Sequence, residues 1–210
     1  MLDLLTVVFD AEIPYLEIQA KSIEVYLKSD EINNIIVIVN DRIDVVGKIN
    51  LDWFGPNRAK VKIYHHSHLS PGIDTHFGWG AQQLCKMLGT TLSTAEWCIT
   101  LDAKTFFVAP QSFKDLMTDD NRFYSNLRDI SHWFVKSNEF IKNTFGIDLN
   151  YKTIEPGGVP FPFHVPTINS LVDHFGYHNF VSSLQQDIKD RKSTRLNSSH
   201  TDISRMPSSA

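Results

Sequence analysis

Four short apolar runs along the chain predict the strands of a sheet. Residues 4–9 (LLTVVF) and 35–39 (IIVIV) are continuous and rich in β-branched side chains. Both are too short for a buried helix, and runs that are apolar on both faces are typical of parallel strands covered by helices on each side. Residues 61–64 and 97–101 (WCITL) predict two further strands. The runs therefore indicate a largely parallel sheet.

Segments of helical periodicity separate these strands. Residues 13–27 repeat apolar side chains at roughly helical spacing, with Pro14 in the first turn, where proline is tolerated. Residues 80–88 predict a second helix that presents Leu84 and Leu88 to the core. Alternation of strands and helices favours an α/β fold with an open, mostly parallel sheet flanked by helices. Weaker patterns predict helical pieces at 113–117, 133–145 and 167–174, and a strand at 122–125.

Composition excludes several classes of protein. The chain has 210 residues, 42% of them hydrophobic, with a formal net charge of −4. A mildly acidic chain is no broad electrostatic match for nucleic acid, and the sequence has no apolar run of about 18 residues that would predict a transmembrane segment. The two cysteines, Cys85 and Cys98, lie in apolar surroundings, which favours reduced core thiols and a cytoplasmic protein.

Residues 190–210 (DRKSTRLNSSHTDISRMPSSA) depart from the pattern of the rest of the chain. They are rich in Ser, Thr and Arg and have no hydrophobic period, which predicts a disordered tail. Residues 190–200 and 204–210 also resemble a translated sequencing adaptor. We therefore expect a single α/β domain over residues 1–189, truncated at its C-terminus, followed by an artefactual tail.

Polar side chains follow three of the predicted strands. Asp10 follows the first strand, Asn40 and Asp41 follow the second, and Asp102 and Lys104 follow the fourth. In open α/β sheets, ligands bind beyond the carboxyl ends of the strands, where the strand order reverses. These residues are therefore candidates for a ligand site, although Asp and Asn also occur at strand exits for purely local reasons.

Residues 101–107 (LDAKTFF) resemble the DxD segment of nucleotide-sugar-dependent glycosyltransferases with the GT-A fold. Together with the preceding helix, whose residues 82–86 read QQLCK, they are similar to an uncharacterised glycosyltransferase-like family, and the resemblance extends over residues 4–175. It implies a GT-A-like, Rossmann-like sheet that binds a nucleotide-sugar donor and transfers the sugar to a hydroxyl acceptor, for example in a surface polysaccharide. It further implies these positions: Asp102 and Lys104 at the diphosphate, Asp10, Asn40 and Asp41 near the nucleotide, and Gln82, Gln83 and Lys86 near the donor sugar.

Lys104 stands where that motif has its second acid. Two interpretations follow for the charge of the departing nucleotide. Asp102 would bind Mn²⁺ or Mg²⁺ with help from another residue such as His164, or Lys104 would neutralise the diphosphate without a metal. We favour the second, because a lysine ammonium suits phosphate oxygens. A third possibility is a structural ion pair between Lys104 and Asp102.

Other functions are left as alternatives. Gln82 and Lys86 lie four residues apart and share one helix face, which is either a ligand-facing or a solvated face. The loss of the second acid is also compatible with a non-catalytic nucleotide-sugar-binding protein. A nucleotidyltransferase is less favoured, because residues 9–17 (FDAEIPYLE) lack the Gly-rich loop expected after the first strand.

Overall fold

The centre of the molecule is a five-stranded sheet in the order β3-β2-β1-β4-β7. The computed structural model describes residues 1–73, 78–124, 128–129, 132–148, 153–154 and 160–186. β1 pairs in parallel with both β2 and β4, and β2 pairs in parallel with β3. The strands are β1 (Leu2–Val8), β2 (Ile32–Val39), β3 (Val61–His65), β4 (Trp97–Asp102) and β7 (Phe161–His164). The predicted fold class, an open and mostly parallel α/β sheet flanked by helices, is confirmed.

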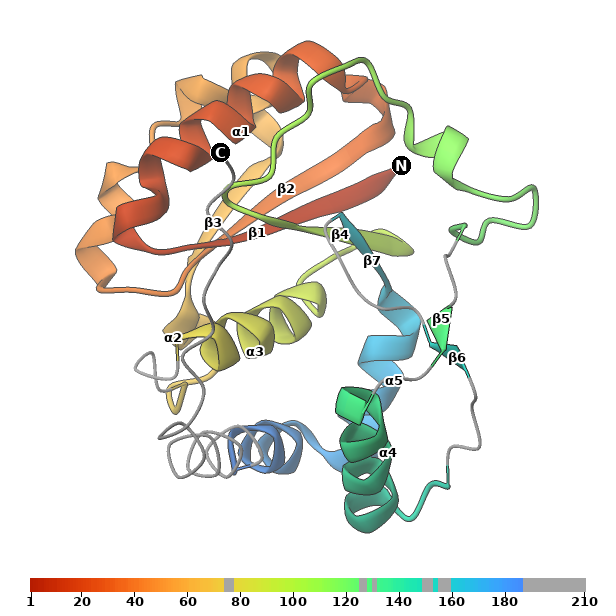
Figure 1. Ribbon diagram of the computed structural model, residues 1–210. Coiled ribbons are helices and arrows are strands. Elements are labelled where there is room, and N and C mark those ends of the chain that lie inside the picture. The colour runs from red at the N-terminus through yellow and green to blue at the C-terminus, as the bar shows by residue number, and fades with distance from the viewer. Residues whose placement is uncertain (74–77, 125–127, 130–131, 149–152, 155–159, 187–210) are drawn as a thin grey trace, which may run out of the picture.

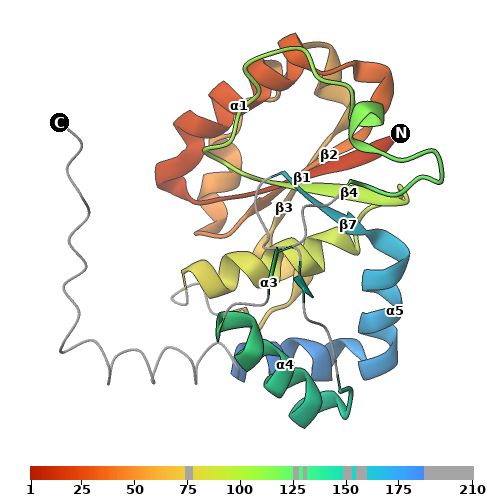
Figure 2. The same ribbon diagram turned by 45° about the vertical axis from the view of Figure 1, so that its right-hand side comes forward.

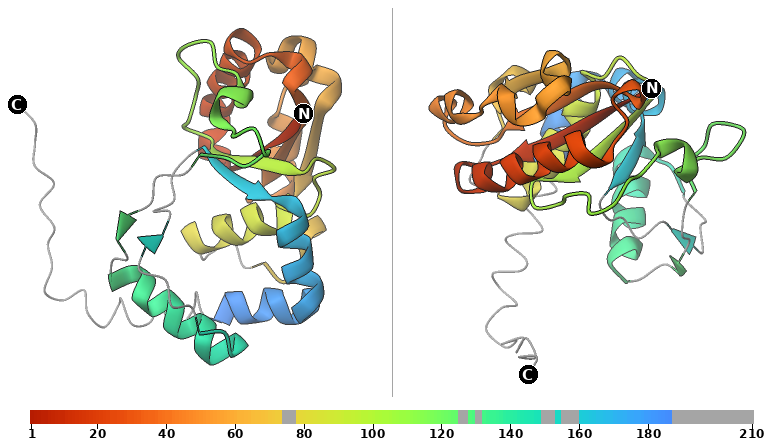
Figure 3. Two further views of the ribbon diagram at one scale, coloured as in Figure 1. Left: turned by 90° about the vertical axis from the view of Figure 1, so that its right-hand side faces the viewer. Right: turned by 90° about the horizontal axis from the view of Figure 1, so that it is seen from above.

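Helices cover both faces of the sheet (Figures 1 and 2). The helix α1 (Ile13–Tyr26) lies on one face with the 3₁₀ segments η3 (Ile43–Lys48) and η4 (Leu51–Lys60). The helices α3 (Trp79–Thr90) and α5 (Val165–Phe175) lie on the other face. Figure 3 shows these layers from two further directions.

Side chains of β1 alternate between two hydrophobic cores, one on each face of the sheet. Leu4 and Val8 pack on the α1 side, whereas Leu5 and Val7 pack on the α3 side. All four are fully buried. The apolar runs of β1 and β2 are continuous because each strand supplies side chains to the cores on both faces, as the sequence indicates.

Helix α3 approaches the sheet closely at Gly89. A Cβ atom at this position would lie 2.6 Å from Leu5 Cδ1, so a larger residue would require the Leu5 side chain or the helix to shift. Leu84 and Leu88 are buried on the same side, as predicted. The packing fixes the position of α3, and with it that of Lys86.

The strand β7 was missed by the sequence analysis. It runs antiparallel to β4 at the edge of the sheet, with Pro162 opposite Ile99. Proline in a strand is tolerated at a sheet edge, where its missing N–H removes no ladder hydrogen bond. The sequence analysis predicts only a helix at 167–174 in this region, and the Pro-rich segment before it carries no strand pattern.

The weaker predictions had mixed outcomes. The sequence predicts a strand at 122–125, of which the structure describes residues 122–124. Among these only Phe123 forms a β-bridge, with Met117, so the predicted strand is wrong there. The helical pieces are confirmed as η6 (Phe113–Leu116), α4 (His132–Phe145) and α5. The other described elements are η1 (Asp10–Glu12), η2 (Ser29–Glu31), α2 (His66–Leu69), β5 (Arg128–Asp129), β6 (Thr153–Ile154) and helical residues 177–186.

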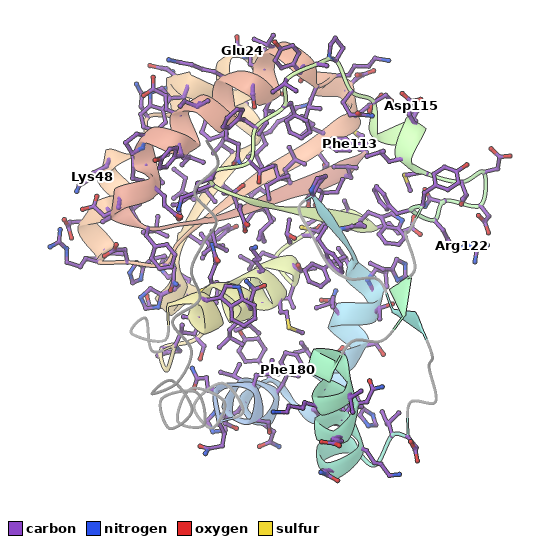
Figure 4. The ribbon with its side chains drawn as sticks, viewed as in Figure 1. Glu24, Lys48, Phe113, Asp115, Arg122 and Phe180 are labelled. Atoms are coloured by element: carbon purple, nitrogen blue, oxygen red, sulfur yellow. The ribbon has the colours of Figure 1, made fainter. Side chains whose placement is uncertain are left out.

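The last described helical residues, 177–186, complete the core on the α3 side. Phe180 is 2% exposed and packs there, where Figure 4 labels it.

Cys85 and Cys98 are both free and buried, and burial raises the pKa of each thiol to about 12. Among the described residues, no helix is long and apolar enough to cross a membrane. The tail expected at 190–210 lies outside the described residues.

Candidate functional site

The strand order reverses between β1 and β4. From β1 the chain crosses over α1 to β2, and from β3 it crosses over α3 on the opposite face to reach β4. Crossovers that diverge in this way leave a crevice at the carboxyl ends of the two central strands. Asp102 is the last residue of β4 and pairs with Val7 of β1, so it lies at this point.

Asp102 is held by a lysine from α3. Lys86 Nζ donates a short hydrogen bond to Asp102 Oδ1 and forms an ion pair with it. The Lys86 side chain is only 8% exposed, whereas that of Asp102 is 43% exposed. The ammonium is therefore the buried partner, and the carboxylate is the partner accessible to solvent. Sequence analysis had placed Lys86 near the donor sugar and had not linked it to Asp102.

The turn after β4 is anchored by Gln19 of α1, a residue that the sequence analysis missed. Gln19 Nε2 donates to the carbonyl oxygens of Asp102 and Thr105, both at 2.7 Å. Its Oε1 accepts from Thr6 Oγ1 at 2.8 Å. Gln19 is 1% exposed and lies among the apolar residues of the buried α1 face. This buried polar residue fixes the backbone on both sides of Lys104.

Lys104 lies on the turn but not against Asp102. Its Nζ is 3.4 Å from Glu12 Oε1 and 5.8 Å from the centre of the Tyr15 ring, and the side chain is 64% exposed. The possible ion pair between Lys104 and Asp102 is therefore wrong, because each residue has another partner. An exposed ammonium with one long ion pair remains available to an anionic ligand.

The residues predicted near the nucleotide gather at the ends of β1 and β2. Asp41 Oδ2 accepts from the Asp10 backbone N–H at 2.9 Å, and Asp10 Oδ1 lies 2.6 Å from Lys48 Nζ. Figure 4 labels Lys48 near this end of the sheet. Hydrogen bonds from the backbone N–H groups of Asp10 and Arg42 lower the pKa of the Asp41 carboxyl.

Asn40 lies deeper than its neighbour Asp41. It is 1% exposed, and its Oδ1 accepts a weak hydrogen bond from Cys85 Sγ at 3.7 Å. Its Nδ2 has no hydrogen-bond partner among the residues that the structure describes. Gln82 and Gln83 are partly exposed on α3, one turn before Lys86. Gln82 and Lys86 lie on one side of α3, but the glutamine is partly exposed whereas the lysine is buried.

His164 does not share a site with Asp102. It ends β7 and lies opposite Trp97, the first residue of β4, whereas Asp102 is the last. Five residues of extended strand separate the two positions by about 16 Å. His164 instead hydrogen-bonds Thr167 Oγ1 and lies 3.7 Å from Glu96. The expected metal site made jointly by Asp102 and His164 is therefore wrong, because β7 runs antiparallel to β4.

Asp102 is the carboxylate that the sequence analysis places at the diphosphate, with a divalent cation as one interpretation. One carboxylate oxygen is already engaged by an ammonium, and the second acid of the resembling motif is replaced by Lys104. No group of three or more His, Cys, Asp or Glu residues in the described part of the chain is arranged to hold a metal ion. Mg²⁺ is usually bound by one or two carboxylates together with waters and substrate phosphates, and the Asp102 carboxylate is already paired with an ammonium.

The comparisons with known proteins gave matches to solved structures only. No family model and no curated protein sequence matches the chain. The apo structure of the bifunctional glycosyltransferase WbbM aligns with a TM-score of 0.44 at 12% identity, over 80% of this chain and 32% of that one. The galactosyltransferase LgtC, in complex with donor and acceptor sugar analogues, aligns with a TM-score of 0.40 at 14% identity, over 84% of this chain. The chain spans 64% of the length of LgtC, and about a third of WbbM.

Proposed function

We propose that this chain is the donor-binding domain of a glycosyltransferase, which moves a sugar from a nucleotide-sugar to a hydroxyl acceptor such as a glycan. The observation that carries the proposal is the position of Asp102. It ends a buried strand at the reversal of strand order, is partly exposed, pairs with Lys86 of α3, and is followed two residues later by the exposed Lys104. The LDAKTFF resemblance supports the same reaction class.

The reaction needs positive charge where the nucleotide leaves. The bond between the anomeric carbon and the diphosphate breaks, a bond to the acceptor oxygen forms, and the acceptor hydroxyl loses its proton. Negative charge then grows on the nucleoside diphosphate, and a cation held close to it lowers the barrier. Lys104 fits this role because its side chain is largely exposed and lies on the turn that follows Asp102.

The remaining polar groups fit a donor of this class. Asp10, Asn40 and Asp41 lie at the ends of β1 and β2, where we propose that they bind the nucleotide. Gln82 and Gln83 would contact hydroxyl groups of the donor sugar. We propose that the reaction runs without a divalent cation, with lysine ammonium groups in its place.

Turnover of the donor tests the reaction class. The full chain is incubated with UDP-, GDP- and CMP-linked sugars plus simple glycan acceptors, and release of free nucleotide is measured with Mn²⁺ and with EDTA. We expect release from one donor under both conditions, and at least a tenfold loss in Asp102→Asn, which keeps a hydrogen-bonding oxygen for Lys86. The matched control is Asp120→Asn, which removes one charge from the exposed ion pair with Arg122. Equal activity in both variants would contradict the role of Asp102.

A second candidate function is supported by the same ion pair. Since Lys86 already neutralises Asp102, the chain would serve as a non-catalytic nucleotide-sugar-binding protein. A ligand that binds only the native state raises the melting temperature. A thermal shift with UDP, GDP or CMP but no nucleotide release from any donor would favour this function. No shift with any of them would contradict both functions.

A further inference from the structure

The buried end of Lys86 occupies the place at Asp102 that a metal ion would need. The ammonium lies on Oδ1 from the protein side, and the side chain that carries it is almost entirely enclosed. A dication at that oxygen would have to displace the ammonium or lie beside it. The ammonium and the dication carry like charges and would repel each other at the same carboxylate.

The backbone on each side of the ion pair is anchored, which disfavours movement of Lys86 away from Asp102. The carbonyl of Lys86 accepts from Thr90 Oγ1 at 2.9 Å, and α3 packs closely on Leu5 of β1 at Gly89. On the other side, Gln19 holds the carbonyl of Asp102. The ion pair is thus built into the contact between α3 and β4 and does not depend on a flexible surface side chain.

A lysine ammonium has three donors, and Asp102 Oδ1 takes one of them. Lys104 is engaged elsewhere, by Glu12. The positive charge nearest to Asp102 within the described part of the chain is therefore that of Lys86.

We propose that the Lys86 ammonium is a built-in substitute for the divalent cation at Asp102. It neutralises the carboxylate, excludes metal from it, and so keeps the carboxylate from repelling the diphosphate of the donor. The last of these roles rests on the proposed function, whereas the exclusion of metal does not. It follows that removal of the ammonium should convert Asp102 into a metal ligand.

Titration with Mn²⁺ alone tests the exclusion of metal. Free Mn²⁺ is followed by its electron paramagnetic resonance signal, and the melting temperature is measured in parallel, for the full chain and for Lys86→Glu. We expect no Mn²⁺ effect in the original chain. In Lys86→Glu, two carboxylates face each other, so Mn²⁺ should bind and raise the melting temperature. The double variant Lys86→Glu/Asp102→Asn should lose most of this effect.

The matched control is Lys21→Glu, which reverses the charge of an exposed lysine paired with Glu17 on α1. It should gain no Mn²⁺ binding, because neither side chain is enclosed. Binding of Mn²⁺ to the original chain that is abolished by Asp102→Asn would overturn the proposal. So would a folded Lys86→Glu variant that binds Mn²⁺ no better than Lys21→Glu.

Titration with UDP and GDP tests the role at the diphosphate. The original chain should bind one of them equally well in EDTA and in Mn²⁺. Lys86→Met keeps the volume of the side chain but not its charge, and it should bind about tenfold more weakly in EDTA. Mn²⁺ should restore much of that loss.

Dependence of the original chain on Mn²⁺ would overturn the proposal even if neither Lys86 variant folds. Unchanged affinity in a folded Lys86→Met would contradict the role of the Lys86 charge in diphosphate binding. A chain that binds no nucleotide under any condition would contradict the proposed function, while the Mn²⁺ titration would still decide whether Lys86 excludes metal.

Discussion

Asp3 is a carboxylate buried at the amino end of the sheet, opposite the candidate site. Its Oδ1 accepts from Asn33 Nδ2 at 2.9 Å, and from Asn34 N and Nδ2 at 2.7 and 3.0 Å. Its Oδ2 accepts from Ser93 Oγ at 2.6 Å and Thr94 N at 3.1 Å. One residue thus connects the start of β1 to the start of β2 and to the turn between α3 and β4.

Substitution of Asp3 should reduce stability without touching the site. Asp3→Ala leaves several buried donors without an acceptor, and we expect the free energy of unfolding to fall by about 3 kcal/mol. Urea denaturation followed by circular dichroism measures this change. Asp119→Ala, at an exposed position, should change it by less than about 0.5 kcal/mol. A loss for Asp3→Ala as small as the control's would contradict the role assigned to this carboxylate.

Single residues of the candidate site were partly predictable. Asp10, Asn40 and Asp102 follow apolar runs directly, and a parallel sheet brings such strand ends to one edge. The partner of Asp102 was not predictable, because it depends on how far α3 is displaced along the sheet. Gln19 carried a usable signal, since it is a large amide at a core position of the α1 pattern.

At the scale of elements, α1 acts on the turn after β4 through Gln19. Gln19→Leu keeps the approximate volume but removes the donor to Asp102 and Thr105, so the turn should open more often. We expect faster amide hydrogen exchange in residues 103–108, together with weaker nucleotide binding. Mass spectrometry of deuterated peptides measures the exchange.

The comparison variant is Gln185→Leu, which likewise removes one hydrogen bond from a glutamine amide to a carbonyl oxygen, that of Gly72. Exchange in residues 103–108 should stay unchanged there. If Gln19→Leu were destabilised but exchanged normally in this turn, the glutamine would contribute to packing and not to positioning of the site.

Strands differ in how clearly their sequence predicts them. β2 is buried on both faces and pairs on both sides, so only a continuous apolar run suits it. β7 pairs on one side only and contains Pro162. Its pairing is decided by the exposed side of β4, a tertiary contact that leaves little trace in a local pattern. The edge strand was therefore missed, and with it the correct position of His164.

At the scale of the whole molecule, stability should depend on pH through a histidine at the carboxyl edge of the sheet. Burial lowers the pKa of His66 below its usual value, the neighbouring His65 lowers it further, and Asp41 opposes both effects. In the unfolded chain the same imidazole would take up a proton near pH 6.5. Just below that pH the unfolded state therefore binds more protons than the folded state.

The contribution of His66 should be fully present above about pH 6.5 and should be lost progressively as the pH falls below it, down to the lowered pKa of the folded state. Urea denaturation at pH 7.5 and pH 5.5 measures the effect. We expect a smaller free energy of unfolding at pH 5.5, and a smaller difference between the two values in His66→Gln, which cannot be protonated. Between pH 7.5 and 8.5, His66 should contribute no change in either protein. A variant that loses as much stability on acidification as the original chain would show that other groups dominate this range.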